Sequence, residues 1–505
     1  MIAQALAVAL AAIAFVPLDD RPVTAQLPPM LGAIAGVRVE SPPGRDLGRY
    51  LARGDSDAVV RWLNRQSRDS QITAYVVSTD MLAYGGLVAS RVPGASYADA
   101  YSRLAILKAI RARRPQAWIG AFGTIMRLAP TGTPAASGYF AAYPAWTFLQ
   151  QYANLPDAAT SDATAARRAL EDRIGAPTLD AYRATRARNL AVDRHLLGLV
   201  ADRTIDRLAL GQDDAGPVGL HVAEVRLLQE EVSGLEIGAR ASIEPGADEL
   251  GMAFVAGALA RHARWTPRIG VRYSTATGST YQDPLEFAPI SAAIDALVGL
   301  CGGVRDDERP DVELYVRVPG TNAADDDAFV AAMKRDAEAG LPVALADLSF
   351  LKSYRDQASF AQRLLATGLA ARLDAYASWN TNANTVGTAL AEAVAAGAGR
   401  RTKTYDSLAH RTFTLVRFLD DFAFHDEVRP ELNATLDAHG IADHTLLAPE
   451  VAAASAQFDR AMLWNRAQTI VTLLDPGYHI AAMQIELPWN RTFETRIDVG
   501  IAPNL

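Results

Sequence analysis

The sequence predicts an α/β fold with a mainly parallel sheet. Short apolar runs alternate with amphipathic stretches along most of the 505 residues, and this alternation is typical of βαβ units. Several runs end in acids, amides or arginine, as in IAFVPLDDRP and RLALGQDD. Small and β-branched apolar residues followed by such groups indicate a buried parallel strand with polar side chains at its carboxyl end. Active sites of α/β proteins lie at this edge of the sheet.

The predicted strands are more numerous than those of a closed (β/α) barrel. They cover residues 13–18, 37–41, 72–78, 118–123, 208–211, 235–243, 269–273, 312–318, 343–348 and 375–379, and helices are predicted between them at 98–113, 220–232, 328–339 and 385–396. We therefore expect a (β/α)-barrel-like body with extra strands. The alternative is two doubly wound α/β lobes around a cleft.

Two regions depart from this alternation. Residues 144–200 are rich in Ala and Arg and predict a helical insertion, and residues 400–465 are again helical in character. The chain closes with LPWNRTFETRIDVGIAP, which predicts a terminal strand pair. The predicted organisation is an α/β body over 15–399 and a mostly helical C-terminal region over 400–505.

The apolar segment 1–14, MIAQALAVALAAIA, resembles the hydrophobic part of a signal peptide and is too short to span a membrane. It favours a secreted or cell-envelope location. The alternative is a cytoplasmic protein in which part of this segment forms the first strand. We expect no integral membrane segment.

Composition narrows the classes of partner. Half of the residues are apolar and the net charge is -8, without a run of like charge, so nucleic acid is not an expected partner. The single cysteine, Cys301, excludes an internal disulfide and predicts a small buried residue. The oligomeric state is not predicted.

The pair Asp213 and Asp214 is the strongest catalytic candidate because it directly follows the apolar run RLALG. Neighbouring carboxyl groups raise one another's pKa, which keeps one protonated and able to act as an acid. Glycosidases that use the substrate's N-acetyl group carry such a pair: one acid protonates the leaving oxygen and the other orients the acetamide. The alternative is that Asp214 caps a helix that begins near residue 219.

Asp248 and Glu249 form a second acidic pair, before the apolar helix GMAFVAGALA. They are candidate partners of the first pair in glycoside hydrolysis, where the separation of the carboxyl groups decides between retention and inversion. The alternative is that Asp248 caps this helix and Glu249 faces the positive end of its dipole.

Substrate-binding candidates follow the first, third and fourth predicted strands. Asp19, Asp20 and Arg21 lie in the block LDDRP, where the arginine alternatively pairs with its neighbouring acids. Further candidates are Asp80, Tyr84, Arg91 and Arg127, with Gly85 and Gly86 allowing close backbone approach. The arginines neutralise these acids or hold an anionic group, and Arg91 is expected to be a buried counter-ion.

The block WNTNANT combines an aromatic ring with amides. Trp379 is predicted to stack on a sugar ring, and the polar residues Asn380, Thr381, Asn382 and Asn384 both donate and accept hydrogen bonds. The alternative is a core tryptophan followed by the cap of the next helix.

The sequence lacks the motifs of several common catalytic mechanisms. GxSxG, HExxH and P-loop sequences do not occur, and the His residues are scattered. No cofactor and no metal are expected, although carboxylates alone suffice for Mg²⁺ or Ca²⁺.

Six blocks together carry a family resemblance. The blocks PLDDRPVT, STDMLAYGGLVASR, QDDAGPVG, PGADE, WNTNANTVGTALA and LPWNRTFE resemble those of the uncharacterised bacterial family catalogued as domain of unknown function 4127. The resemblance implies that these blocks belong to one fold, and it implies no activity. From the residues we expect a glycoside hydrolase acting on a poly- or oligosaccharide, including one with N-acetylated sugars. The alternatives are a non-catalytic carbohydrate-binding protein and a carboxylate-metal-dependent hydrolase or phosphotransferase.

Overall fold

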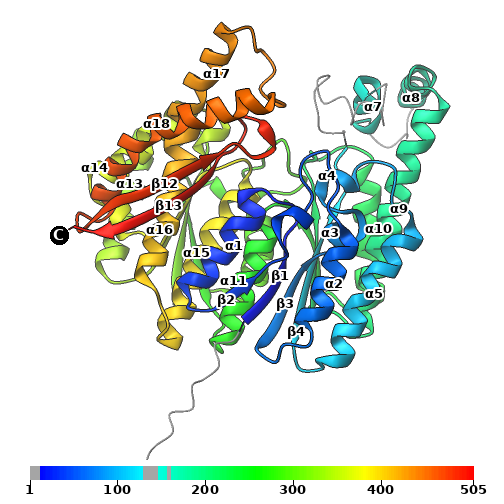
Figure 1. The fold of residues 1–505 in the computed structure, drawn as a ribbon, viewed down its shortest axis with the longest axis horizontal. Coiled ribbons are helices and arrows are strands. Elements are labelled where there is room, and N and C mark those ends of the chain that lie inside the picture. Colours follow the sequence, from blue (N-terminus) through cyan, green and yellow to red (C-terminus); the bar gives the residue numbers. More distant parts are fainter. Residues whose placement is uncertain (1–11, 129–145, 156–160, 505) are drawn as a thin grey trace, which may run out of the picture.

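The strands of the computed structural model form two parallel sheets and one antiparallel pair (Figure 1). The structure describes residues 12–128, 146–155 and 161–504. The first sheet has the order β2-β1-β3-β4-β5-β6 and contains β1 (Ala12–Val16), β2 (Arg38–Glu40), β3 (Ile72–Ser78), β4 (Trp118–Ile125), β5 (Arg207–Gln212) and β6 (Ala241–Pro245). The second has the order β11-β10-β9-β7-β8 and contains β7 (Arg268–Tyr273), β8 (Val304–Arg305), β9 (Val312–Arg317), β10 (Val343–Asp347) and β11 (Ala375–Ala377).

The two sheets share one topology. If the strands of the second sheet are renumbered from β7, their order is 2-1-3-4-5, the same as the first five strands of the first sheet. This is the doubly wound order whose ligand crevice opens between strands 1 and 3, at their carboxyl ends. The predicted α/β class with parallel strands is confirmed, and the division into two sheets is the arrangement of our alternative expectation.

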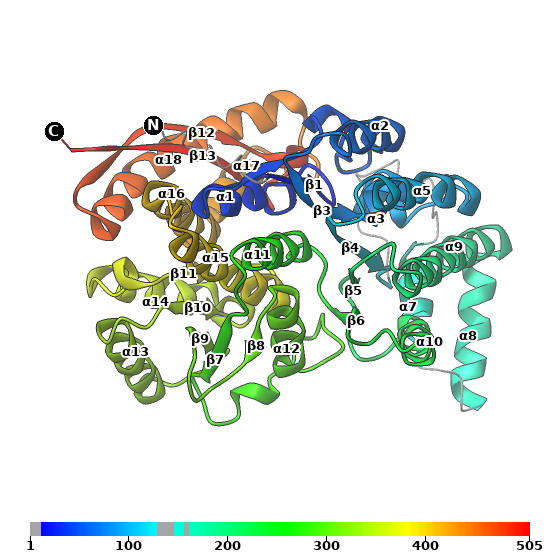
Figure 2. The ribbon, with the colours of Figure 1, turned by 90° about the horizontal axis from the view of Figure 1, so that it is seen from below.

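Helices from both halves of the chain fill the space between the sheets (Figure 2). These are α1 (Leu27–Ile34), α11 (Leu250–His262), α12 (Ile290–Leu300) and α15 (Asn382–Thr402). α11 is apolar on every side because it packs on the first sheet through Phe254 and on α15 as well. Residues of both sheets and of these helices form one hydrophobic cluster, which includes buried Cys301 as predicted. The two lobes therefore share a core.

The outer faces of the sheets carry the remaining helices of each lobe. The first sheet is covered by α2 (Ser56–Gln66), α3 (Thr79–Tyr84), α5 (Tyr97–Arg113), α9 (Ala176–Ala201) and α10 (His221–Gly234). The second is covered by α13 (Ala323–Glu338), α14 (Tyr354–Ala366), the π-helix η6 (Phe418–Val428) and α18 (Pro449–Leu474). Alternate residues of each strand face the two sides, as the pleat requires.

The predicted helical insertion is present within the described residues. It consists of α7 (Trp146–Ala153), α8 (Ser161–Ile174) and α9, of which α7 and α8 stand beside the carboxyl end of the first sheet (Figure 1). The short helix α4 (Leu87–Ser90) lies at the same end.

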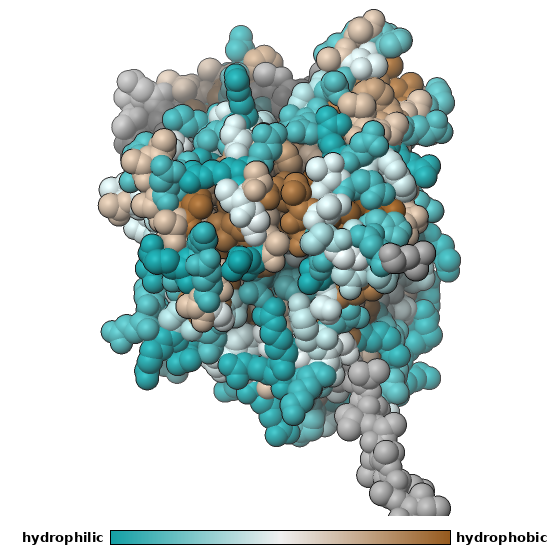
Figure 3. All heavy atoms as spheres, turned by 90° about the vertical axis from the view of Figure 1, so that its left-hand side faces the viewer, coloured by the Kyte–Doolittle hydropathy of each residue, from teal (hydrophilic) through white to brown (hydrophobic). Residues whose placement is uncertain are grey.

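The C-terminal region is mostly helical, as predicted, with α16 (Ser407–Arg417), η6, α17 (Arg429–Ala438) and α18 before β12 (Tyr478–Glu486) and β13 (Arg496–Pro503). The strand pair is confirmed, but its first strand precedes residue 487, where we had placed it. Hydrophobic side chains gather in a band on the face that carries α14 and α18 (Figure 3), where Leu365, Ile470 and Leu473 line an open apolar hollow.

The N-terminal segment and the strand expected at 235–243 have other boundaries in the structure. The segment 1–14 includes the first residues of β1, and Ala12–Ala14 pair with both β2 and β3; residues 1–11 lie outside the described residues. The strand expected at 235–243 begins only at Ala241 because residues 235–240, after the end of α10 at Gly234, mostly form turns. Among the described residues, no helix is both long and apolar enough to cross a membrane.

Candidate functional site

A cavity of about 400 Å³ lies at the carboxyl ends of the first sheet, and we call it the site cavity. It is lined by Arg21, Tyr50, Leu87, Val88, Arg91, Arg127, Asp213, Asp214, Gly246, Ala247, Asp248, Leu285, Asn380, Asn384, Thr445, Trp489, Arg491 and Phe493. Most of these residues follow β1, β3, β4, β5 and β6 of the first sheet or β11 of the second, while Thr445, Trp489, Arg491 and Phe493 come from the C-terminal region. The structure therefore brings many of the predicted site residues into one place.

Strand register explains why these residues meet. Ile125 of β4 pairs with Gln212 of β5, and Gln212 pairs with Pro245 of β6, so the three strands end at nearly the same level. Asp213, the residue after β5, and Gly246, the residue after β6, are therefore neighbours at the sheet edge. The crevice between β1 and β3 opens at the same edge, as expected for this strand order.

Asp213 is held in a buried ion pair with Arg91. Arg91 Nε donates to Asp213 Oδ2 at 2.9 Å, and Arg91 Nη2 lies 2.5 Å from the same oxygen. Both side chains are almost fully buried, so the expected role of Arg91 as a buried counter-ion agrees with its position. Asp80 is buried close to this pair, where burial raises its pKa to about 7 and the charge of Asp213 adds to the increase. Asp80 does not line the site cavity.

Asp214 is the more accessible member of the first acidic pair. Its side chain is 30% exposed, and Arg127 Nη1 lies 3.0 Å from Asp214 Oδ2. Burial raises the pKa of Asp214 against the opposing charge of Arg127, and the neighbouring Asp213 adds to the increase. The next helix, α10, begins at His221 without a side-chain cap, so Asp214 is not its N-cap.

Arg21 joins the two acidic blocks that are farthest apart in the sequence. Its Nη1 and Nη2 donate to Asp248 Oδ2 and Oδ1 at 2.9 and 2.6 Å, and its Nε donates to Asp19 at 3.0 Å. All three side chains are buried. Asp248 therefore pairs with an arginine and does not cap α11, whose N-cap is Glu249. Asp19 holds Arg21 in place and does not line the site cavity.

Glu249, expected among the catalytic residues, lies beneath the site cavity. It is fully buried, and its Oε2 accepts hydrogen bonds from Ala247 N at 3.1 Å and Asn384 Nδ2 at 3.2 Å. Burial raises the pKa of Glu249 well above its ordinary value. The geometry gives Glu249 the position of a support for the 246–248 turn and for Asn384.

Some residues of the WNTNANT block line the site cavity, and others lie in the core. Asn380 and Asn384 line the site cavity, while Thr381 caps α15 by accepting from Asn384 N. Trp379 belongs to the hydrophobic core and its Nε1 donates to Thr388 Oγ1 at 3.0 Å. Asn382 is fully buried and does not line the site cavity.

Trp489 and its neighbours form the wall that sequence reasoning missed. The Trp489 ring stacks on Tyr50 with ring centroids 5.2 Å apart, and its Nε1 donates to Asp20 Oδ1 at 2.6 Å. The guanidinium groups of Arg21 and Arg491 lie 4.9 and 4.4 Å from the centroid of this ring. The signal was present in the block LPWNRTFE, which joins an aromatic ring and an arginine.

The backbone at this wall is in the left-handed region. Trp489 has φ 59° and Asn490 has φ 53°, a conformation that costs free energy in a residue other than glycine. The packing of Trp489 on Tyr50, Arg21 and Arg491 offsets this cost. Asp20 lies behind the ring rather than in the cavity, and burial raises its pKa to about 6.

Gly85 and Gly86 follow α3 with φ 90° and 124°, so their backbone conformation requires glycine. A Cβ on Gly48 would lie 2.3 Å from the Gly85 carbonyl oxygen, so the close approach is to the neighbouring loop. We had expected an approach to a ligand. Tyr84 is buried with Arg188 over its ring and does not line the site cavity.

An adjoining cavity of about 300 Å³ shares Arg21, Asn380 and Phe493 with the site cavity. Its other lining residues include the second-lobe and C-terminal residues Tyr354, Trp379, Asp420, His425, Arg429 and Glu494. Although Trp379 packs in the core, one part of it thus borders this cavity. The two cavities extend the candidate site from the first lobe toward the second.

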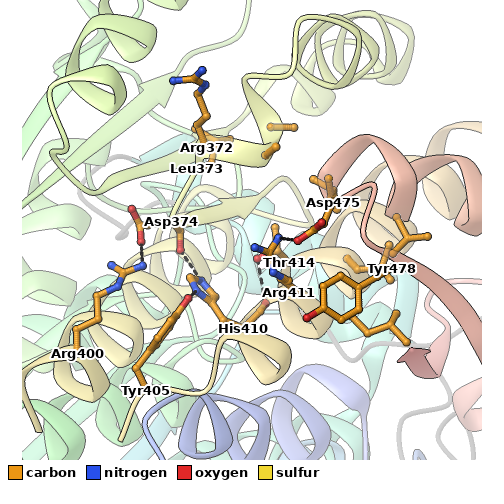
Figure 4. A pocket seen from close by; sticks show the side chains of 16 residues that line it. Arg372, Leu373, Asp374, Arg400, Tyr405, His410, Arg411, Thr414, Asp475 and Tyr478 are labelled. Atoms are coloured by element: carbon orange, nitrogen blue, oxygen red, sulfur yellow. Dashed lines mark hydrogen bonds and ion pairs between the residues drawn. The ribbon is translucent and has the colours of Figure 1, made fainter. Parts of the chain in front are cut away.

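A third cavity, of about 210 Å³, lies at the amino end of β11 (Figure 4). Its polar residues bond to one another: His410 lies 2.9 Å from the Asp374 carbonyl oxygen and 2.8 Å from the Tyr405 hydroxyl, and Asp374 pairs with Arg400. Because it lies at the opposite end of the strand from Asn380 and contains none of the predicted site residues, it is not the candidate site.

Among the described residues, no group of three or more His, Cys, Asp or Glu side chains is arranged to hold a metal ion. A family model described as protein of unknown function (DUF4127) matches residues 13–498. Neither the curated proteins nor the solved structures contain a significant match to the chain.

Proposed function

Since the chain belongs to DUF4127, a family of proteins of unknown function, we propose its function from the chemistry of the site cavity: it is a glycoside hydrolase. The observation that carries the proposal is the position of Asp214, which borders the cavity with a pKa raised by burial. A carboxyl group whose pKa lies above its ordinary value keeps its proton to a higher pH, which is what the general acid of glycoside hydrolysis needs.

The other cavity acids fit the remaining roles. Asp213 and Asp248 both border the cavity and both accept hydrogen bonds from arginine, which fixes the orientation of their carboxylates. In our proposal Asp214 protonates the leaving glycosidic oxygen. A carboxylate, Asp213 or Asp248, stabilises the positive charge that develops on the sugar or orients the group that attacks it.

The walls of the cavity suit a sugar. Trp489 and Tyr50 supply aromatic surface, and Asn380 and Asn384 supply amides that donate and accept. The adjoining cavity adds Trp379, Tyr354 and further polar groups within reach of the same substrate. We therefore propose an oligosaccharide or polysaccharide substrate, with one sugar in each cavity.

The test is a screen of aryl glycosides and polysaccharides for product release by the purified protein. Asp214→Asn is expected to fold normally and to lower turnover at least about a hundredfold, as for the loss of a general acid. Asp180→Asn is the matched control, because Asp180 is an exposed acid of α9 without an ion pair in the described structure. Its turnover should equal that of the wild type.

Three outcomes would contradict the proposal. Near-normal turnover by folded Asp214→Asn would remove this residue from the acid role. A glycan that raises the melting temperature but yields no product would favour a carbohydrate-binding protein. Loss of activity with a chelator and its return with Mg²⁺ or Ca²⁺ would favour a metal-dependent hydrolase.

A further inference from the structure

A groove of about 1080 Å³ runs between the first lobe and the C-terminal region, and we call it the arginine groove. One wall is the loop after β2, from Gly44 to Arg53, and the other is formed by the start of α18 and by the β12–β13 connection. Its volume exceeds that of the site cavity, so it has room for a larger ligand.

The groove has a strong excess of positive charge. Its lining includes Arg45, Arg49, Arg53, Arg460 and Arg496, against the acids Asp20 and Glu486. The protein as a whole carries a net charge of -8, so this concentration of arginine is local. Such a cluster holds anionic groups through the planar, forked guanidinium donors.

Several of these arginines form no ion pair with a carboxylate in the described structure. Arg49 and Arg460 are exposed, and neither forms an ion pair or side-chain hydrogen bond within the part of the chain that the structure describes. Arg53 Nη2 donates to the Pro93 carbonyl oxygen, a neutral acceptor. These guanidinium groups therefore retain the capacity to bind an anion, unlike the arginines of the site cavity, which pair with acids.

The arginine groove and the site cavity share one wall. Leu487, Pro488 and Asn490 line the groove, while Trp489 and Arg491 line the cavity. The left-handed conformation of Trp489 and Asn490 turns neighbouring residues toward opposite sides of this wall. Asp20 lines the groove and accepts a hydrogen bond from Trp489, which lines the site cavity. A ligand that contacts Asp20 in the groove is therefore separated from the cavity by the Trp489 side chain alone.

The lining also indicates which anionic chain fits. Gln457, Gln484 and Asn490 supply amides, and no aromatic side chain lines this groove of the described structure. Sites for single-stranded nucleic acid stack bases on aromatic rings, so the groove lacks a main element of such sites. A ligand that carries hydroxyl groups next to carboxylates or sulfates fits this lining better, because the amides can bind the hydroxyl groups and the arginines can bind the anionic groups.

We propose that the arginine groove binds an acidic polysaccharide, a chain of sugars that carry carboxylate or sulfate groups. This assignment rests on the proposed function in one respect: the glycan in the groove is the continuation of the substrate whose reacting sugars occupy the site cavity. The binding of anionic groups by the arginines of the groove does not depend on hydrolysis in the site cavity.

The experiment measures binding of the purified full chain to polygalacturonate, dextran sulfate and neutral dextran of similar length, at low and at physiological salt. The double variant Arg49→Gln/Arg460→Gln is compared with Arg65→Gln/Arg355→Gln, which removes the same charge from exposed arginines that lie outside the groove. We expect binding to one of the acidic glycans, weakening with salt, and at least about tenfold weaker binding by the groove variant alone. The preferred glycan distinguishes carboxylate from sulfate recognition.

Equal binding by the two double variants, or equal binding of neutral dextran, would overturn the proposal. Tighter binding of polyglutamate or of an oligothymidylate would also overturn it, in favour of an acidic protein segment or a nucleic acid. If acidic glycans bind in the groove but no glycan is hydrolysed, the groove assignment stands and the glycosidase proposal fails. If a short aryl glycoside is hydrolysed at the wild-type rate by the groove variant and acidic glycans do not bind, only the groove assignment fails.

Discussion

Arg127 Nη1 lies 3.0 Å from Asp214 Oδ2 at the border of the site cavity. The guanidinium lowers the pKa of Asp214, while burial raises it, and burial has the larger effect. The proton affinity of the proposed acid is therefore a balance between its depth in the cavity and one neighbouring charge. A change in either should move the pH range of activity.

Arg127→Gln should shift the alkaline limb of the pH–rate profile to higher pH. Without the guanidinium, the carboxyl group of Asp214 keeps its proton to a higher pH, so an acid catalyst stays active further into the alkaline range. Rates of glycoside cleavage from pH 4 to 10 measure the shift. Arg127→Lys is the control that retains the charge, and an unchanged limb in Arg127→Gln would argue against Asp214 as the titrating group.

Arg21→Ala should destabilise the protein by about 3 kcal/mol or more. The substitution leaves Asp19 and Asp248 buried without their shared guanidinium, and breaking a buried ion pair from one side costs far more than losing an exposed pair. Arg38→Ala, which removes an exposed pair with Glu40, should cost less than about 1 kcal/mol. Urea unfolding of both variants gives the comparison, and similar losses would mean that the Arg21 pairs add little.

Trp379→Ala and Trp489→Ala should differ in their largest effect. Trp379 packs in the core, so its truncation should lower the free energy of unfolding by about 3 kcal/mol or more. Trp489 is buried against Tyr50 and also borders the site cavity, so its truncation should weaken glycan binding by about 1 to 2 kcal/mol beyond its effect on stability. Melting temperature and titration calorimetry separate the two effects, and an affinity loss confined to Trp379→Ala would reverse the assignment.

Asp80→Asn should gain stability relative to the wild type as the pH rises from about 4 to about 7. Burial raises the pKa of Asp80 from 3.8 to about 7 in the folded protein. Between these values the unfolded chain has lost the proton that the folded chain retains, so rising pH favours unfolding of the wild type. The difference should reach about 1 kcal/mol or more by pH 8.

Urea unfolding of Asp80→Asn and the wild type at pH 5 and pH 8 measures this change. Asp180→Asn, which alters an exposed acid of α9, should show the same stability difference from the wild type at both pH values. A constant difference for Asp80→Asn as well would show that Asp80 titrates in the folded protein as it does in the unfolded chain.

Strand positions were predictable because each depends on a local pattern. The strand expected at residues 72–78 coincides with β3, and the one at 312–318 differs from β9 by a single residue. The two-residue strand β8 was missed because it has too few residues to show a period. The first strand of the terminal pair, β12, lies before residue 487 and was not predicted.

The candidate site was predictable where residues follow strands. Asp213, Asp214 and Asp248 follow β5 and β6, and all three border the site cavity. Glu249 was expected among the catalytic residues but is buried beneath the site cavity. Neighbouring residues at a turn point in different directions, and the sequence does not show which of them faces the cavity. Trp489 was missed because its wall comes from a connection between antiparallel strands, not from the end of a parallel one.

The sequence by itself determined the α/β class, the parallel strands and the edge at which their polar side chains gather, because apolar periodicity and the residues after each strand are local properties. Only the tertiary structure decided that the strands divide into two sheets of one topology. It also decided that Arg21 pairs with Asp248, 227 residues away, and that Trp489 closes the cavity. These contacts depend on how helices such as α11 and α15 pack between the sheets. The sequence does not show this packing, because a buried parallel strand is equally apolar in one barrel-like sheet and in two separate sheets.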